Sequence, residues 1–247
     1  MRTSIPMKKL LLIASGMTLS TCVLAVDRAS AQILLDFEGL GDTEQVLEFY
    51  NGGTGSSGIS SGTNYGVSFL PGAQASISVS AGGTGDFINE PSPDTAALFL
   101  TGPGSLVMNV AAGFTTGFSF FYTADASFPP TSVRVYDALG GAAGGGNILA
   151  TISLPNNAFD NNCGPIGSTF CNWDAVGASF SGTAFSVDFS NAANEVAFDN
   201  ITIGRDTPCL NQAQCGQVQV PEPTSVMGLL AVSALGAGSV LRRKLLK

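Results

Sequence analysis

Carboxylates are the only abundant side chains in this sequence that could perform acid–base or metal chemistry. The chain has 18 Asp and Glu residues and no histidine. A sequence without histidine has no Ser-His or Cys-His nucleophile and no His-bound zinc. Glycoside hydrolysis needs only two carboxyl groups, so a carboxylate-pair hydrolase is compatible with this composition. No pair of acids stands out as catalytic, and we therefore expect a protein that is not an enzyme.

Two aromatic features could stack on a sugar ring. Trp173 is the only tryptophan and is flanked by polar residues. Tyr50 and Tyr65 flank a glycine-rich stretch at residues 51–66, whose backbone could approach a ligand closely. We predict a ligand-binding role for Trp173. The alternatives are that Trp173 covers a neighbouring disulfide and that the glycine-rich stretch is only a hairpin connection.

Short β-strands must position these side chains. Apolar and polar residues alternate in segments such as residues 133–136, and glycine, serine and asparagine separate the segments. This period-2 pattern at short intervals predicts an all-β protein with an antiparallel sandwich at residues 32–204. We expect strands at residues 33–37, 67–70, 75–79, 96–100, 106–110, 118–122, 133–137, 148–154, 185–189 and 196–203.

The middle of the chain is strongly acidic. Between residues 33 and 219 there are 16 Asp and Glu residues but only two cations, Arg134 and Arg205, which gives a net charge of −14. Nucleic acid and anionic lipid are disfavoured as partners, because both need Lys and Arg to replace their counterions. The charge favours cations as ligands, or simple solubility outside the cell.

The first residues have the pattern of a signal peptide at residues 1–31. A basic start containing Lys8 and Lys9 is followed by an apolar stretch, and Ala29 and Ala31 occupy the small-residue positions that signal peptidase requires. We predict cleavage after Ala31. The alternatives are an N-terminal membrane anchor and a lipoprotein acylated on Cys22.

The other end of the chain contains a candidate membrane span. Residues 224–241 carry no charge and would extend about 27 Å as a helix, close to the thickness of a hydrocarbon core. Basic residues follow at once, so the positive-inside rule places this end in the cytoplasm and the domain across the inner membrane. Residues 205–219 are rich in Gln and Asn and are predicted to be a linker.

A Pro-Glu-Pro sequence directly precedes the span, and its prolines favour an extended backbone. The order of Pro-Glu-Pro, apolar segment and Arg-rich end at residues 220–247 resembles the PEP-CTERM sorting signal. The resemblance implies processing by exosortase, an integral-membrane enzyme, for delivery to the cell surface or matrix. The implied recognition residues are Pro221, Glu222 and Pro223, with Arg242 and Arg243 as the basic stop. An ordinary single-pass anchor is the alternative.

Four cysteines remain after the expected cleavage, an even number that is typical of exported proteins with disulfides. Their close spacings favour two local pairs, Cys163 with Cys171 and Cys209 with Cys215, although four cysteines permit three connectivities. A zinc site is the weaker interpretation, because the spacings lack a Cys-x-x-Cys step.

Acidic residues near both ends of the domain resemble the terminal-strand pattern of jelly-roll carbohydrate-binding modules and related adhesive domains. The matching sequences are Asp-Phe-Glu-Gly at residues 36–39 and Ala-Phe-Asp-Asn-Ile at residues 197–201. The resemblance implies an antiparallel jelly-roll-like β-sandwich with adjacent first and last strands. It also implies a structural calcium ion (Ca²⁺) held by Glu38 and Asp199, with Asp36 as a weaker ligand. The alternative is that Asp199 only caps a strand or hydrogen-bonds a loop.

Together these patterns predict an exported cell-surface or extracellular-matrix protein. The domain is expected to be a non-catalytic binding or structural module associated with extracellular polysaccharide. A secreted glycan-acting hydrolase with an Asp/Glu pair and a purely structural, self-associating protein are the alternatives.

Overall fold

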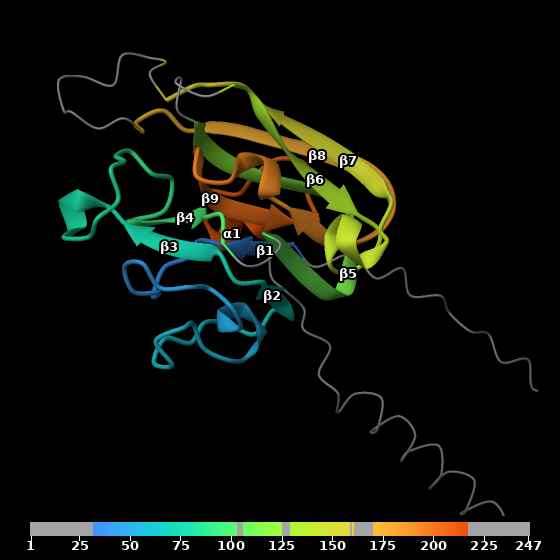
Figure 1. Ribbon diagram of the computed structural model, residues 1–247, viewed down its shortest axis with the longest axis horizontal. Helices are drawn as coiled ribbons and strands as arrows, with labels where there is room; N and C mark the ends of the chain where they lie inside the picture. Colours follow the sequence, from blue (N-terminus) through green and yellow to red (C-terminus); the bar gives the residue numbers. More distant parts are fainter. Residues whose placement is uncertain (1–31, 103–105, 125–128, 159, 161–169, 217–247) are drawn as a thin grey trace, which may run out of the picture.

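The computed structural model describes residues 32–102, 106–124, 129–158, 160 and 170–216 (Figure 1). All strand pairings between named strands are antiparallel. The predicted all-β antiparallel architecture is therefore confirmed. The strands are β1 (Ile33–Leu35), β2 (Val67–Phe69), β3 (Ala73–Ile77), β4 (Thr95–Phe99), β5 (Val107–Ala124), β6 (Thr131–Tyr136), β7 (Ile148–Leu154), β8 (Asp174–Asp188) and β9 (Val196–Ile203).

Five single-turn helices interrupt or follow the strands. They are short because glycine, which adopts a left-handed conformation easily, ends several of them. Their bounds are η1 (Phe49–Asn51), η2 (Val79–Ala81), η3 (Gly141–Gly144), η4 (Ser190–Ala192) and α1 (Gln212–Cys215).

The long strands β5 and β8 connect two layers. The first part of β5 pairs with β2, and its second part pairs with β9. Between these parts the register with β8 shifts twice, and Thr116 has a φ of 75°. Such bulges bend a strand, so the ribbon of β5 and β8 passes from one layer to the other. One layer contains β2, β6 and β7, and the other contains β1, β3, β4 and β9 (Figure 1).

Aromatic rings fill the space between the layers. Phe99 of β4 stacks on Phe189, which follows β8, with ring centroids 3.9 Å apart. Phe120 of β5 meets the ring of Phe198 edge-on at 5.2 Å. Edge-to-face and stacked pairs of this kind stabilise a core beyond the burial of their area.

The first and last strands pair with each other. Ile33 of β1 lies opposite Ile203 of β9, and all eight residues of β9 are buried. A φ of 48° at Asn200 marks an irregularity in β9, beside the carboxylate of Asp199. The pairing brings the residues that follow β1, including Asp36 and Glu38, to the same region as Asp199.

The end of the described chain packs against the sandwich. Cys209 and Cys215 are buried and cluster with Leu34 of β1, and Ser119 of β5 donates a hydrogen bond to the carbonyl of Arg205. The described residues of the predicted linker at residues 205–219, up to Gly216, thus pack against the sandwich. Local apolar periodicity misses this contact, because one disulfide and a few side chains hold the segment rather than a regular strand.

The two ends of the chain lie outside the described residues. This applies to the predicted signal peptide at residues 1–31 and to the predicted membrane span at residues 224–241. Within the described part of the chain, no helix has the length and apolar character needed to cross a membrane.

Candidate functional site

A buried glutamate organises the loop that builds the candidate site. The Glu44 side chain, only 6% exposed, accepts hydrogen bonds from the backbone of Gly41 and Ser57 and from the hydroxyls of Ser57 and Ser60. Burial alone would raise the pKa of this carboxyl, but the hydrogen bonds hold it below its usual value. Glu44 thus connects two parts of the loop that follows β1, which are Gly41 near its start and the glycine-rich stretch at residues 51–66. The sequence offered no signal for this role.

The single turn η1 sets two aromatic side chains side by side. The rings of Phe49 and Tyr50 meet edge-on at 4.8 Å, and the Tyr50 hydroxyl accepts a 2.7 Å hydrogen bond from the backbone of Phe37. Burial, and then the charge of Asp36, raise the pKa of Tyr50 well above its usual value. Gly62 closes against this pair, since a Cβ there would lie 2.5 Å from a carbon of the Phe49 ring.

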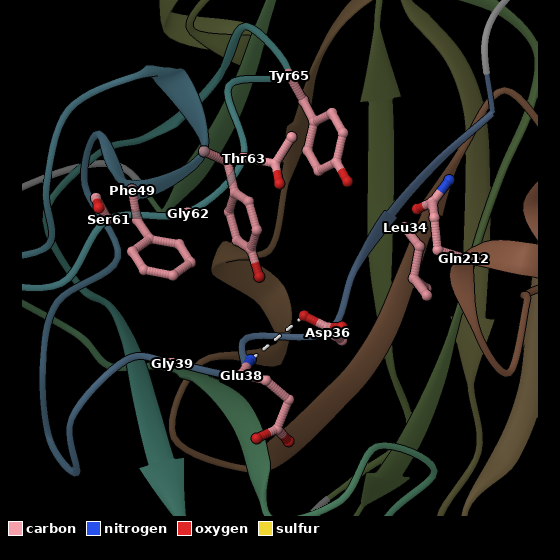
Figure 2. A pocket seen from close by; sticks show the side chains of 11 residues that line it. Leu34, Asp36, Glu38, Gly39, Phe49, Ser61, Gly62, Thr63, Tyr65 and Gln212 are labelled. Carbon is pink, nitrogen blue, oxygen red and sulfur yellow. Dashed lines mark hydrogen bonds between the residues drawn. The ribbon is translucent and has the colours of Figure 1, made fainter. Parts of the chain in front are cut away.

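The strand β1, the loop after it and α1 surround a pocket with a volume of about 350 Å³. Figure 2 shows Phe49, Thr63 and Tyr65 on one side, Asp36 and Glu38 across from them, and Gln212 beside Leu34. The pocket therefore combines β1, the loop after it and the C-terminal helix α1. It is lined by Leu34, Asp36, Glu38, Gly39, Phe49, Tyr50, Ser61, Gly62, Thr63, Tyr65 and Gln212.

The lining combines aromatic faces with polar atoms. The rings of Tyr50 and Tyr65 lie 6.2 Å apart and 22° from parallel, while Thr63, Gln212 and the two carboxylates offer hydrogen-bonding groups. Apolar surface with a few convergent polar groups is the usual character of a small-ligand site. A sugar ring, which has apolar C–H faces and a rim of hydroxyls, suits such a lining.

Burial perturbs the carboxyl of Asp36 at the pocket. Burial raises the pKa of its carboxyl, the nearby charge of Glu38 also raises it, and hydrogen bonds from the Glu38 backbone and the Tyr50 hydroxyl act in the opposite direction. The Glu38 backbone nitrogen lies 3.3 Å from Asp36 Oδ1. Both acids line the pocket, but in Figure 2 the Glu38 carboxylate extends away from Thr63 and Tyr65, whereas Asp36 lies nearer to them.

Glu38 and Asp199 hold the segment before β4. Glu38 Oε1 accepts 3.0 Å hydrogen bonds from the backbone of Asp94 and Thr95. Asp199 accepts 2.6 Å hydrogen bonds from the backbone of Ser92 and Asn200. Burial raises the pKa of Asp199 to about 8, against the effect of these hydrogen bonds, and the charge of Glu38 adds to the rise.

The side chains around Glu38 and Asp199 provide part of the ligand set that a calcium ion needs. Glu38 and Asp199 are close enough for their charges to interact, and the neighbouring Asn200 has a buried Oδ1 that accepts no hydrogen bond from the described residues. Calcium needs six to eight oxygens, so backbone or amide oxygens would have to complete the set. Within the described ranges, no three Asp, Glu or Cys residues gather as a metal site, and the calcium site with Asp36 stays a prediction.

Trp173 lies outside the pocket lining. Its indole N–H donates a 3.0 Å hydrogen bond to the carbonyl of Ile88, and its ring meets Phe87 edge-on at 5.9 Å. These contacts are those of a packing residue at the edge of a small cluster. A ligand-binding role for Trp173 stays a prediction.

One of the two predicted disulfides lies within the described chain. Cys209 and Cys215 are bonded to each other across α1. Cys171 is also disulfide-bonded, but Cys163 lies outside the described residues, so the pairing of these two stays a prediction. The Cys209–Cys215 bond holds the helix that places Gln212 at the pocket, a link that the sequence did not reveal.

The C-terminal end matches a known sorting motif. The model of the PEP-CTERM protein-sorting motif matches residues 219–244. This chain carries a PEP-CTERM tail. The prediction of such a tail is confirmed, and the motif marks the protein for export. Pro221, Glu222, Pro223, Arg242 and Arg243 all fall within the matched residues, although their individual roles stay predictions.

Solved structures of low identity resemble this chain in part. The K2 cleaved adhesin domain of Lys-gingipain is 12% identical, with a TM-score of 0.43 over 70% of this chain and 99% of that domain. The carbohydrate-binding module CBM6cm-2 of Cellvibrio mixtus lichenase 5A is 13% identical, with a TM-score of 0.27 over 54% and 87%. The CBM22-1 xylan-binding domain of Paenibacillus barcinonensis Xyn10C is 10% identical, with a TM-score of 0.32 over 68% and 98%. No protein with a curated description matches the chain. At these identities and scores, the structural likenesses do not extend to any ligand.

Proposed function

We propose that this protein is exported, processed at its PEP-CTERM tail by an exosortase and displayed at the cell surface or in the extracellular matrix. There its β-sandwich binds polysaccharide without catalysing a reaction. Signal peptidase removes the first 31 residues, and the C-terminal span holds the chain in the inner membrane until it is processed. The observation that carries the binding role is the pocket of aromatic and polar side chains on a chain with a sorting motif.

A sugar suits the pocket as ligand because the aromatic side chains match the apolar C–H faces of a sugar ring and the polar side chains match its hydroxyls. The half-buried Tyr65 ring borders the cavity beside the buried Tyr50, and a ring stacked on a sugar face is a common source of affinity. Polar groups at Thr63 and Gln212 are placed to bond hydroxyls.

Glycan-array binding by the purified full-length protein tests the proposal. Tyr65→Ala should lower affinity for the bound glycan at least tenfold, because it removes the more accessible ring. Ile148→Ala is the matched control, since Ile148 on β7 is 51% exposed and does not line the pocket. A wild type that binds no glycan, or a Tyr65→Ala variant that binds as the wild type does, would contradict the proposal.

One observation favours hydrolysis as a second candidate function. Asp36 has a raised pKa beside Glu38 in the same pocket, and a carboxyl pair of this kind can supply a general acid and a nucleophile or base. Release of shorter sugars from the bound glycan would identify an enzyme. In that case Asp36→Asn and Glu38→Gln should each abolish release in a protein that still folds, as judged by its melting curve.

We also propose that calcium binds between Glu38, just after β1, and Asp199, in the middle of β9, and stabilises the junction of these two segments. The support is the pairing of two carboxylates at a buried place where one of them, Asp199, resists ionisation without a cation. Its role would be structural, because it would join the residues after β1 to the last strand.

A further inference from the structure

The charges of the pocket restrict the kind of sugar that it can bind. Asp36 and Glu38 are its only ionisable acids, and among the described residues that line it there is no Lys or Arg. Only Arg134 and Arg205 supply side-chain cations between residues 32 and 216. Arg134 lies on β6, opposite Asp188 of β8, and the Arg205 guanidinium donates to the carbonyl of Gln214. Neither arginine lines the cavity.

The Asp36 carboxylate keeps capacity to accept further hydrogen bonds, whereas Glu38 already accepts from the backbone of Asp94 and Thr95 and from the Thr95 hydroxyl. A carboxylate offers about four lone-pair sites. Asp36 accepts hydrogen bonds from the Glu38 backbone and the Tyr50 hydroxyl, which occupy only part of this capacity. The Tyr50 oxygen accepts from the Phe37 backbone, so its own hydrogen is directed to Asp36. Asp36 therefore has acceptor capacity left on the pocket side and no cation to neutralise it.

We propose that the pocket binds an amino sugar through its ammonium group, paired with the carboxylate of Asp36 and supported by Glu38. This inference rests on the proposed binding function and names its ligand class. A hydrogen bond between ammonium and carboxylate is about twice as strong as a neutral one, and partial burial of Asp36 reduces its screening by water. Tyr65 then supports the apolar face of the same ring.

Uronic acids and sulfated sugars do not suit this pocket. Their charge has the same sign as Asp36 and Glu38, and the surrounding domain adds a net negative charge that repels anions at longer range. A neutral sugar meets no such barrier, but it leaves the Asp36 carboxylate without a cationic partner. The order of affinity should therefore be amino sugar first, neutral sugar second and acidic sugar last.

Three tetramers that differ only at carbon 2 test this order in the full-length protein. The probes are β-1,4-linked glucosamine, N-acetylglucosamine and glucose, measured by titration calorimetry at a pH where the free amines are protonated. We expect the wild type to bind the glucosamine tetramer at least tenfold more tightly than the other two. In Asp36→Asn this preference should fall below threefold, with little change for glucose.

Asp206→Asn is the matched control, because it removes the same charge at an exposed position outside the pocket lining. It should retain the preference for glucosamine, which separates a specific pair from general attraction to an acidic protein. If Asp36→Asn does not fold, as judged by its melting temperature, the relative affinities of the wild type for the three tetramers still test the amino-sugar inference.

Equal affinity for the three tetramers, or tighter binding of a uronic acid oligomer in the presence of calcium, would overturn the amino-sugar inference and leave sugar binding itself in place. Equal loss of preference in Asp36→Asn and Asp206→Asn would also overturn it. Absence of binding to every sugar would instead refute the proposed function.

Discussion

Three carboxylates in this protein have different electrostatic environments, and the difference comes from their neighbours rather than from their type. Glu44 is buried but receives four hydrogen bonds, which lower its pKa. Asp199 is fully buried with fewer donors, and burial raises its pKa to about 8. Asp36 lies between these extremes, half-buried at a pocket wall with a raised pKa. The sequence identifies Asp36 and Asp199 as notable, but it cannot assign their ionisation.

The raised pKa of Asp199 predicts that the protein loses stability as pH rises. In the unfolded chain this carboxyl ionises near its ordinary value of 3.8, whereas in the native state it keeps its proton up to about pH 8. The native state thus binds more protons across this range, and the free energy of unfolding falls as pH increases. Without calcium, the melting temperature should decrease from pH 5 to pH 8.

Asp199→Asn should flatten this dependence, because the amide does not ionise. Calcium added at pH 8 should raise the melting temperature of the wild type and leave Asp199→Asn unchanged, since the ion stabilises the ionised carboxylate. Melting curves with calcium and with a chelator measure both effects. Identical wild-type curves in the two conditions would rule out the calcium site, and an unchanged pH slope in Asp199→Asn would assign the slope to other groups.

At the scale of elements, the sequence predicts most strands but not their continuity. Residues 111–117 contain glycine and exposed threonine, so they resemble a turn, yet they continue β5 through a bulge. The first part of β8 is rich in Ala, Gly and Ser, which give a weak strand pattern, and pairing with β5 decides its conformation. Tertiary hydrogen bonding overrides local preference at both places.

The residues of the candidate site are also only partly predictable from the sequence. Tyr50 and Tyr65 are noticeable in the sequence because they flank a glycine-rich stretch, and both line the pocket. Gln212 is separated from them by most of the chain and lies in a segment without a periodic pattern. The disulfide, the burial of Leu34 beside it and hydrogen bonds from Asn200 and to Thr202 hold the segment that carries Gln212 to the cavity.

Removal of the Cys209–Cys215 bond should therefore affect one element more than the fold. Replacing both cysteines by serine should cost about 2 kcal/mol, which is the order expected for a short closed loop. The segment at residues 205–216 should become sensitive to protease, and sugar affinity should fall as Gln212 leaves the pocket. Denaturant unfolding, limited proteolysis and binding measure these changes.

A second test is reduction of the wild type, which breaks the same bond without a substitution, together with the disulfide of Cys171. Reduced wild type and the double serine variant should be cleaved at the same segment. Resistance of both to protease, with unchanged affinity, would show that packing against β1 holds the segment without the disulfide.

At the scale of the whole molecule, the proposed binding pocket and the sorting motif lie in separate parts of one chain. The pocket is complete at Gln212, and the matched sorting motif begins at residue 219. A short segment of the chain thus separates the two functions, so a change in either part can be examined without altering the other.

Replacing Glu222 by Gln should impair sorting without altering the domain, because Glu222 is the only charged residue of the Pro-Glu-Pro sequence. We expect the unprocessed chain to accumulate in the membrane fraction of cells that contain an exosortase. Immunoblots of membrane, surface and medium fractions measure this, with Ser225→Ala as a neighbouring control. Normal surface delivery of Glu222→Gln would contradict the assigned recognition role, while its melting temperature and sugar binding should remain those of the wild type.

The pairing of β1 with β9 also determines when this protein can fold. β9 lies between β5 and the strands β1 and β4, and its residues are all buried, yet it is the last strand to be synthesised. A nascent chain therefore cannot complete its hydrophobic core until residue 203 has been delivered. Closure of the sheet must wait until residue 203 has been exported, so a chain stalled earlier would expose aromatic side chains to proteases outside the cytoplasm.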